Sequence, residues 1–328
     1  MENDHPASPA LPVLLKRAAR LEMQKFQWQT AEEHLTQALA WEEKQHAHFS
    51  DRLLTHHLFQ SLFQTIASHD RGIFHAERAL EIARNEFPSD HPEIAVHLSS
   101  LAQLLQATNR LTEAEPLMRD ALRIDRAAYG DDHSVVAIRL NNLAGLLQVT
   151  NRTVEAEPLM RDALRIDRAA YGDDHPKVAT RLNNLAALLK ATNRPVEAEP
   201  LMRDALRIDR AAYGDDHPKV AIRLSNLAQL LQATNSLTEA EPLMRDALRI
   251  NRAAYGDEHP HVAIRLNNLA GLFRATQRLV EAEPLLREAL RITHASLGPE
   301  HPNTVLVSRN LDSLLAEIES VPAVSAGS

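Results

Sequence analysis

The chain has 328 residues, a formal net charge of −8, no cysteine and only 4% aromatic residues. Without cysteine there are no disulfides and no thiolate metal sites, and the acidic balance argues against a nucleic-acid partner, whose phosphates favour a basic surface. No stretch reaches the roughly 18 apolar residues of a membrane span. The first residues, MENDHPASPALP, lack the basic region and apolar core of a signal peptide, so we expect a cytoplasmic protein.

Two irregular helix pairs are predicted first. We expect residues 1–11 to be disordered and residues 12–91 to hold two degenerate helix pairs, which cap the N-terminal end of the core. Equivalent alanines at Ala31, Ala76 and Ala114 are unevenly spaced, whereas later landmarks follow a constant step. A cluster at His56 and His57 is expected on polar positions of this segment rather than at a metal ion.

Residues 92–301 form five units of 42 residues. The segment RDALRIDRAAYGDDH stands at 119–133, 161–175 and 203–217, and RDALRINRAAYGDEH stands at 245–259. A fixed period in this range predicts a solenoid, in which each unit buries its apolar face against its neighbours. Because a repeated unit is not by itself an active site, the pattern favours a surface that holds another molecule.

Each unit is predicted to contain two helices. In residues 176–217 the first, helix A, should begin at Pro176 and run for about 17 residues, because its apolar residues recur every three or four positions. The acids before Pro176 suit the helix start. Helix B should begin near Val196 and end at Gly214, with Pro200 in or near its first turn, where little hydrogen bonding is lost.

The last predicted element is a lone helix A, Pro302–Ile318, which caps the C-terminal end, followed by a flexible tail at 319–328. The expected fold class is therefore all-α: a right-handed α-solenoid of seven helix pairs and one capping helix.

The repeat resembles the tetratricopeptide repeat, in the 42-residue variety found in kinesin light chains. The resemblance covers about residues 92–318 and depends on the NNLA, EAEPL and GDxHP segments and on the spacing of Leu182, Leu185, Ala186, Leu189, Ala198, Met202 and Ala205. Leucine replaces the usual aromatic late in helix A at Leu147, Leu189 and Leu231, and no heptad-rich coiled coil is present. The resemblance implies that helix A lines the concave side and that its asparagines hydrogen-bond extended peptides.

Two other periodic features are interpreted as structural. The histidines His91, His133, His175, His217, His259 and His301 are one repeat apart, roughly 10 Å, which is too far to share one metal ion. Adjacent acids such as Asp173 and Asp174 complement a helix start. No nucleophile–base pattern or phosphate loop is present. We therefore expect no catalytic residue, no metal and no cofactor.

A row of amides on helix A is the main candidate binding feature. It comprises Asn142, Asn184, Asn226, Asn268 and Asn310, preceded by Asn141, Asn183, Ser225, Asn267 and Arg309. An amide offers donors and an acceptor, so such a row can satisfy a peptide backbone whatever its side chains are. The alternative is that these amides bond to neighbouring repeats and stabilise the stack.

Two further rows run beside the amides. Arg139, Arg181, Arg223 and Arg265 lie one turn earlier and either grip acidic groups of a ligand or bridge to acids on the adjacent helix. Gln148, Lys190, Gln232 and Arg274 lie farther along helix A. Together they predict a polar, mildly basic groove that binds a protein or an extended peptide with acidic residues. The alternatives are a regulatory sensor that switches a partner and a self-assembling structural array.

Overall fold

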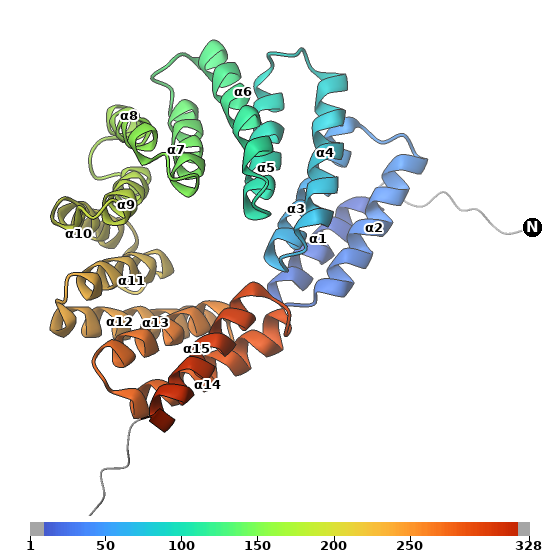
Figure 1. Cartoon of the computed structure of the whole chain (residues 1–328). Coiled ribbons are helices and arrows are strands. Elements are labelled where there is room, and N and C mark those ends of the chain that lie inside the picture. The colour runs from blue at the N-terminus through green and yellow to red at the C-terminus, as the bar shows by residue number, and fades with distance from the viewer. Residues whose placement is uncertain (1–9, 321–328) are drawn as a thin grey trace, which may run out of the picture. The chain divides into compact units, whose positions relative to one another are not determined.

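The computed structural model describes residues 10–320, and these residues form fifteen helices and no strand (Figure 1). The helices are α1 (Leu11–Gln24), α2 (Trp28–Lys44), α3 (Phe49–Thr65), α4 (His69–Glu86), α5 (Pro92–Ala107), α6 (Leu111–Tyr129), α7 (Ser134–Val149), α8 (Thr153–Tyr171), α9 (Pro176–Ala191), α10 (Pro195–Tyr213), α11 (Pro218–Ala233), α12 (Leu237–Tyr255), α13 (Pro260–Ala275), α14 (Leu279–Leu297) and α15 (Pro302–Ser320). None of these helices is long and apolar enough to cross a membrane.

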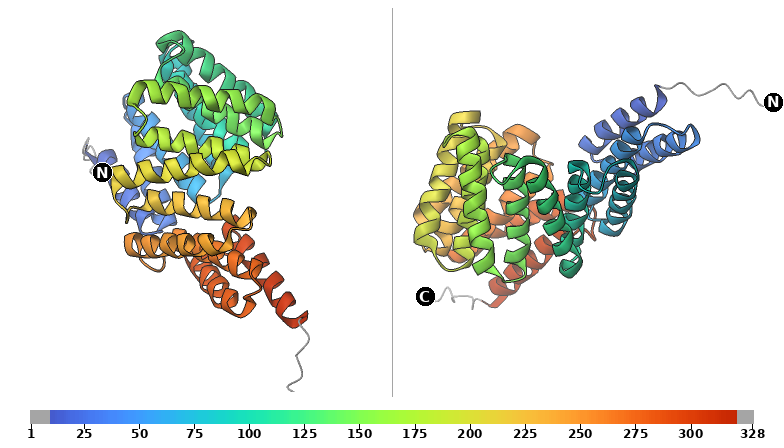
Figure 2. Two further views of the ribbon diagram at one scale, coloured as in Figure 1. Left: turned by 90° about the vertical axis from the view of Figure 1, so that its left-hand side faces the viewer. Right: turned by 90° about the horizontal axis from the view of Figure 1, so that it is seen from above.

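The chain divides into two compact units, one up to Leu159 and one from Met160, and the boundary falls within α8. In the first unit α1 packs on α2, α3 on α4 and α5 on α6, and α2, α4 and α6 each contact the helix that follows. The second unit repeats this arrangement with the pairs α9–α10, α11–α12 and α13–α14, and α15 closes it against α14. Figure 2 shows the yellow and orange helices of the second unit lying as successive layers. We refer to α5, α7, α9, α11, α13 and α15 as A helices and to α6, α8, α10, α12 and α14 as B helices.

The A helices begin at a histidine cap. His175 has extended backbone angles, and its Nδ1 accepts a hydrogen bond from the backbone N–H of Lys177 at 3.2 Å. The equivalent histidines before α5, α7, α11, α13 and α15 make the same bond at 3.1–3.3 Å. The ring of His175 also stacks on Tyr171, with centroids 4.6 Å apart. The cap is thus the histidine, and the preceding acids, predicted to complement the helix start, pair with arginines instead, as Asp173 does with Arg168 at 2.9 Å.

The A helix and the B helix of each pair end in different ways. At the end of α9, Asn193 adopts a left-handed φ of 58°, and the N–H of Arg194 reaches back to the carbonyl of Leu189 at 2.8 Å. This is a Schellman stop, in which asparagine replaces the commoner glycine. At the end of α10, Gly214 has φ 84° and ψ 163°, a region that side chains essentially exclude. Helix B therefore ends at Gly214 with a positive φ, but the left-handed helical stop that is predicted for a glycine here is wrong, because a ψ of 163° is extended.

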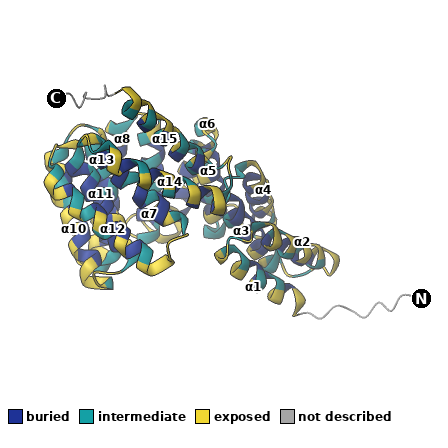
Figure 3. Ribbon diagram, turned by 90° about the horizontal axis from the view of Figure 1, so that it is seen from below, coloured by how far each residue is buried: buried dark blue, intermediate teal, exposed yellow. Residues whose placement is uncertain are grey.

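The core lies between the two helices of each pair and between successive pairs, and it consists mainly of alanines and leucines. The buried residues are dark blue in Figure 3. On α10, Ala198, Met202, Ala205, Leu206 and Ile208 are buried, whereas Ala212, a predicted alternative to Ile208 on this face, is exposed. The periodicity of apolar residues therefore predicts most of the packing face of α10 but not the buried Asp209.

Three local predictions need correction. Pro200 is the sixth residue of α10, beyond the first turn, so the carbonyl of Val196 loses its intrahelical donor. Val196 is 85% exposed, which lets water satisfy that carbonyl. The helix α15 continues to Ser320 rather than ending at Ile318, and α1 begins at Leu11. The remainder of the segments predicted to be disordered lies outside the described residues.

His56 was expected on a polar position but is buried. Its Nδ1 lies 2.9 Å from the Nδ1 of His75 on the neighbouring helix, and the ring of Phe59 stacks on His75. Burial is the main cause that lowers the pKa of His56 to about 4 and that of His75 to about 3. This pair is a neutral part of the core of the first unit.

Candidate functional site

The amide row joins successive A helices. The Nδ2 of four second-position asparagines donates to the first-position side chain of the preceding repeat. The bonds run from Asn142 to Ser99 Oγ (3.4 Å), from Asn226 to Asn183 Oδ1 (2.9 Å), from Asn268 to Ser225 Oγ (3.1 Å) and from Asn310 to Asn267 Oδ1 (2.7 Å). We call this series the amide ladder. These bonds match the alternative in which the amides bond to neighbouring repeats and stabilise the stack.

The two positions of the ladder differ in burial. The donors Asn142, Asn226, Asn268 and Asn310 are half-buried, as are Asn141, Asn184 and Asn267. Three acceptors are buried, Ser99 at 2% exposure, Asn183 at 8% and Ser225 at 1%, and Arg309, at the first position of the last repeat, is exposed. A ligand can therefore reach the donor asparagines but not Ser225. Each donor amide uses one N–H in the ladder, and an amide has a second N–H and an acceptor oxygen to offer.

The arginine row is buried and mostly paired with acids of the preceding B helix. The Nε atoms of Arg139, Arg181 and Arg223 donate to the Oδ2 atoms of Asp125, Asp167 and Asp209 at 2.6, 2.8 and 2.8 Å. Sequence reasoning anticipated a bridge as one alternative but overlooked these aspartates. The signal was present, because Asp209 lies four residues after Ala205 and three after Leu206, on the apolar stripe of its helix.

The fourth arginine lacks this partner. In the fourth 42-residue unit Asn251 replaces the aspartate, and neither the Nε of Arg265 nor the Oδ1 of Asn251 has a hydrogen-bond partner. The Nδ2 of Asn251 donates to the carbonyl of His261 at 3.4 Å. Burial is the main cause that lowers the pKa of Arg265 to about 10.

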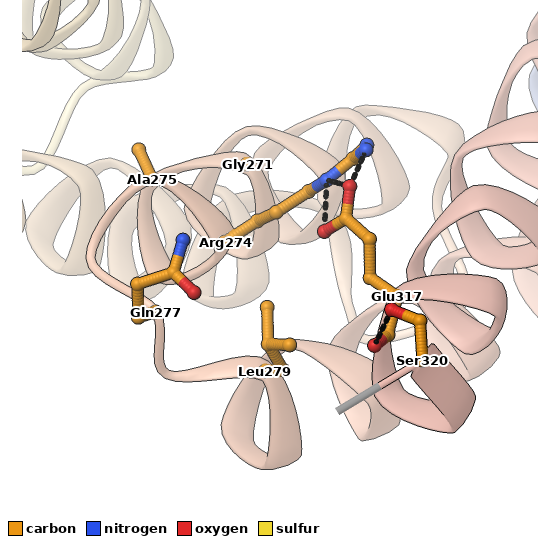
Figure 4. A pocket seen from close by; sticks show the side chains of 7 residues that line it. All are labelled: Gly271, Arg274, Ala275, Gln277, Leu279, Glu317 and Ser320. Atoms are coloured by element: carbon orange, nitrogen blue, oxygen red, sulfur yellow. Dashed lines mark hydrogen bonds and ion pairs between the residues drawn. The ribbon is translucent and has the colours of Figure 1, made fainter. Parts of the chain in front are cut away.

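The third row also reaches the next A helix. Lys190 Nζ donates to the carbonyl of Gln229 at 3.3 Å, and Gln232 Nε2 donates to the carbonyl of Gly271 at 3.3 Å. Burial lowers the pKa of Lys190. Arg274 on α13 forms an ion pair with Glu317 on α15, with its Nε 2.8 Å from Oε2 (Figure 4). Gln148, which lies on α7 in the first of the two compact units, is half-buried.

The second unit has a hollow on its A-helix face. Its volume is about 280 Å³, and it is lined by Gln229, Gln232, Asn267, Asn268, Ala270, Gly271, Arg274, Leu286 and Asn310. A second hollow of about 490 Å³ adjoins it, sharing Gly271 and Arg274 and bounded by Glu317 and Ser320 (Figure 4). Of the predicted residues, the structure thus brings together Gln232, Asn267, Asn268, Arg274 and Asn310 around one hollow. We call the 280 Å³ cavity the A-face hollow.

The remaining titratable clusters are structural. The described residues contain no group of three or more histidine, aspartate or glutamate side chains arranged to hold a metal ion. On the B helices the glutamate–arginine pairs form at the expected spacing, as between Glu241 and Arg245 at 2.8 Å. Arg278 additionally links Glu241 to Glu281, which joins two successive B helices on the exposed surface. Such exposed pairs contribute little individually.

Comparison with known proteins agrees with this geometry. No curated protein matches the chain significantly in sequence. Among solved structures, BtubC (BKLC) from P. vanneervenii is 26% identical, with 73% of this chain and 93% of that chain covered and a TM-score of 0.55. A putative kinesin light chain of Podospora anserina with nearly identical repeats is 23% identical, covering 63% and 98%, with a TM-score of 0.53. A Rap protein complexed with competence and sporulation factor shares the fold at 14% identity, covering 94% and 86%, with a TM-score of 0.61.

The family profile described as "Tetratricopeptide repeat" matches residues 67–127, 93–169, 135–211, 194–253, 224–293 and 262–318. These segments together span most of the chain and include every 42-residue unit. Paired antiparallel helices, the histidine-capped A helices and the kinesin-light-chain-like structural neighbours are consistent with that match. The chain belongs to the tetratricopeptide repeat family.

Proposed function

We propose that the chain is a binding scaffold that holds an extended segment of a partner protein against its A-helix face. Tetratricopeptide repeats are commonly protein-binding scaffolds, and the stacking of repeats creates extended surfaces suited to that role. The observation that carries the proposal is the A-face hollow, where amides and an arginine from three A helices converge.

The chemistry of the hollow favours a peptide backbone as its occupant. Gln229, Gln232, Asn267, Asn268 and Asn310 all line it. Amides both donate and accept, so they match the alternating N–H and C=O groups of an extended chain. The amide ladder holds Asn268 and Asn310 in place through one N–H each. Positions fixed in this way bind at a lower entropic cost than mobile side chains do.

A substitution at Gly271 tests the proposal. Gly271 lines the hollow, is exposed within α13, and a Cβ placed on it would meet no atom within 4 Å. Gly271→Leu should therefore occupy the hollow without disturbing the core, and leucine is the better helix former. Ala253→Leu, at an exposed position of α12, is the matched control.

Random dodecapeptides displayed on phage are selected on the immobilised wild-type protein, and the affinity of the enriched peptides is then measured. We expect Gly271→Leu to weaken binding by at least about 10-fold, which corresponds to roughly 1.4 kcal/mol, and Ala253→Leu to leave it unchanged. Equal binding by both variants would exclude the A-face hollow as the peptide site.

A further inference from the structure

One pair of positions, shared between successive repeats, is chemically balanced everywhere except between the fourth and the fifth repeat. The pair joins the end of a B helix to the following A helix, and it holds an aspartate and an arginine in three repeats: Asp125 with Arg139, Asp167 with Arg181, and Asp209 with Arg223. Where the acid is absent at either end of the array, the arginine is absent as well: Ala83 with His97, and Thr293 with Val307. Only the pair Asn251 and Arg265 keeps the permanent cation without the anion.

Arg265 is therefore a buried charge without a counterion. It is 9% exposed, and no carboxylate within residues 10–320 forms an ion pair with it. The Asn251 amide is uncharged in either orientation and cannot balance the guanidinium. With a pKa near 10 Arg265 remains protonated at neutral pH. Burying an unpaired charge is costly, so an anion that arrives here recovers free energy.

The neighbouring groups do not supply the missing charge. His261 stands four residues before Arg265, where the preceding repeats have Lys177 and Lys219, and burial and Arg265 both lower its pKa. Burial, followed by His261, also lowers the pKa of His259, to about 4. Both histidines are therefore neutral at pH 7. Arg265 is the permanent cation of this cluster.

The equivalent arginine of the preceding repeat indicates where the distal end of the Arg265 guanidinium lies, and 9% of Arg265 remains exposed. In the preceding repeat Arg223 Nη2 donates to Thr180 Oγ1 on α9 at 3.1 Å, which places that end of the side chain between adjacent A helices. The residue equivalent to Thr180 for Arg265 is Ile222, which is 42% exposed and offers no acceptor. Arg265 thus lacks both partners that Arg223 has. It also lies one helical turn before Asn268, which lines the A-face hollow.

We infer that Arg265 binds a carboxylate of the peptide held in the A-face hollow, and that Asn251 keeps the arginine available for it. This inference rests on the proposed function. The ligand carboxylate replaces the aspartate of the other repeats, and a guanidinium pairs with carboxylates in a defined, two-pronged geometry. The fifth repeat therefore sets the position of an acidic group along the bound chain, either an Asp or Glu side chain or a C-terminal carboxylate.

Asn251→Asp provides a test that does not damage the fold, because aspartate occupies this position in the three preceding repeats. The internal carboxylate would pair with Arg265 and compete with the ligand. Thr238→Asp adds the same charge at an exposed position of α12 and controls for general repulsion. Dodecapeptides from one random pool, with free and with amidated C-termini, are selected on all three proteins.

We expect the wild-type and Thr238→Asp proteins to enrich peptides with an acid at one fixed position or with a free C-terminus, and Asn251→Asp to lose that preference. Exchange of the enriched acid for its amide should weaken wild-type binding about 10- to 100-fold and binding to Asn251→Asp hardly at all. An equal acid preference in all three proteins would overturn the inference while leaving the proposed function standing.

If no peptide is enriched, that result counts against the proposed function. A second measurement then tests the carboxylate site at Arg265 without any peptide. Acetate is titrated at constant ionic strength, and the melting temperature is recorded. A ligand that binds the folded state raises the melting temperature. A rise for the wild type that is absent in Asn251→Asp supports a carboxylate site at Arg265. Identical responses of the two proteins refute it.

Discussion

Replacing Asn268 by alanine should destabilise the second unit, although alanine is the better helix former. Asn268 Nδ2 is 3.1 Å from Ser225 Oγ, and Ser225 is 1% exposed. Removing the donor strands a buried hydroxyl, which costs about 1–3 kcal/mol. The gain in helix propensity offsets about 0.6 kcal/mol of that cost. We therefore expect a net loss of about 0.5–2.5 kcal/mol.

The double variant Asn268→Ala/Ser225→Ala separates the ladder bond from other effects. Removing both partners of a buried hydrogen bond can be nearly neutral, because no polar group remains unsatisfied. The double variant should thus be more stable than Asn268→Ala alone. Urea unfolding of the wild type, both single variants and the double variant closes a double-mutant cycle, and the coupling energy should be about 0.5–1.5 kcal/mol.

Additive effects of the two substitutions would refute the ladder as a stabilising contact. A second refuting result would be an Asn268→Ala protein as stable as the wild type. Hydrogen exchange on α13 adds a local readout, because units of a solenoid open separately and a single global transition need not describe them. Protection of α13 should fall in Asn268→Ala and recover in the double variant.

Three further predictions follow from the core and the helix ends. Asp209→Asn places in the third repeat the asparagine that the fourth has at 251. It removes the charged acceptor 2.8 Å from Arg223 Nε and should cost about 1.5–3 kcal/mol in urea unfolding; an unchanged midpoint would contradict it. Gly214→Ala should lower the free energy of unfolding by about 1–3 kcal/mol in thermal unfolding, because Gly214 has a φ of 84°. Gly145→Ala within α7, where a Cβ meets nothing within 4 Å, should instead raise it by about 0.5–1 kcal/mol, and equal effects of the two substitutions would exclude backbone strain at Gly214. Because the folded-state pKa values of His56 and His75, about 4 and about 3, lie below the unfolded value of 6.5, the unfolded chain binds more protons below pH 6.5. The contribution of these histidines to the free energy of unfolding should be fully present above pH 6.5 and should fall by about 1.4 kcal/mol per pH unit for each histidine as the pH drops toward 4. In urea titrations at pH 7, 6 and 5, the double variant His56→Gln/His75→Gln should show a smaller dependence of stability on pH.

The sequence was sufficient for the helices because local rules determine them. Proline at a helix start, the spacing of Leu182, Leu185 and Leu189, and glycine at 214 each act within one or two turns. The histidine cap was located correctly but explained by the wrong residues, because acids beside a helix start are the commoner caps. Only the ring geometry shows that His175 Nδ1 accepts the N–H of Lys177.

The polar contacts of the A-helix face were harder to predict because they depend on how one repeat is rotated against the next. The ladder joins Asn226 to Asn183, which are one repeat and one residue apart, so a small change in that rotation would have paired other side chains. The buried aspartates were overlooked because an acid on an apolar stripe is usually assigned to the surface. Both features require the neighbouring helix to be in place before a partner can be named.

Because the repeats are nearly identical, each position recurs in nearly the same surroundings. A residue that differs in one repeat can therefore be compared directly with its equivalents in the others. The fourth and fifth repeats each depart from the others at one such position. Asn251 replaces an aspartate, and Phe273 replaces the leucine of the preceding A helices, with the guanidinium of Arg278 4.0 Å from its ring. Neither change alters the helix boundaries, since α12 and α13 have the lengths of α10 and α11. The two substitutions are buried and leave the helix frame constant. They act through the arginines that they contact or leave unpaired, Arg278 and Arg265, and such a change of available charge is one way in which a repeat scaffold can acquire preference for one partner.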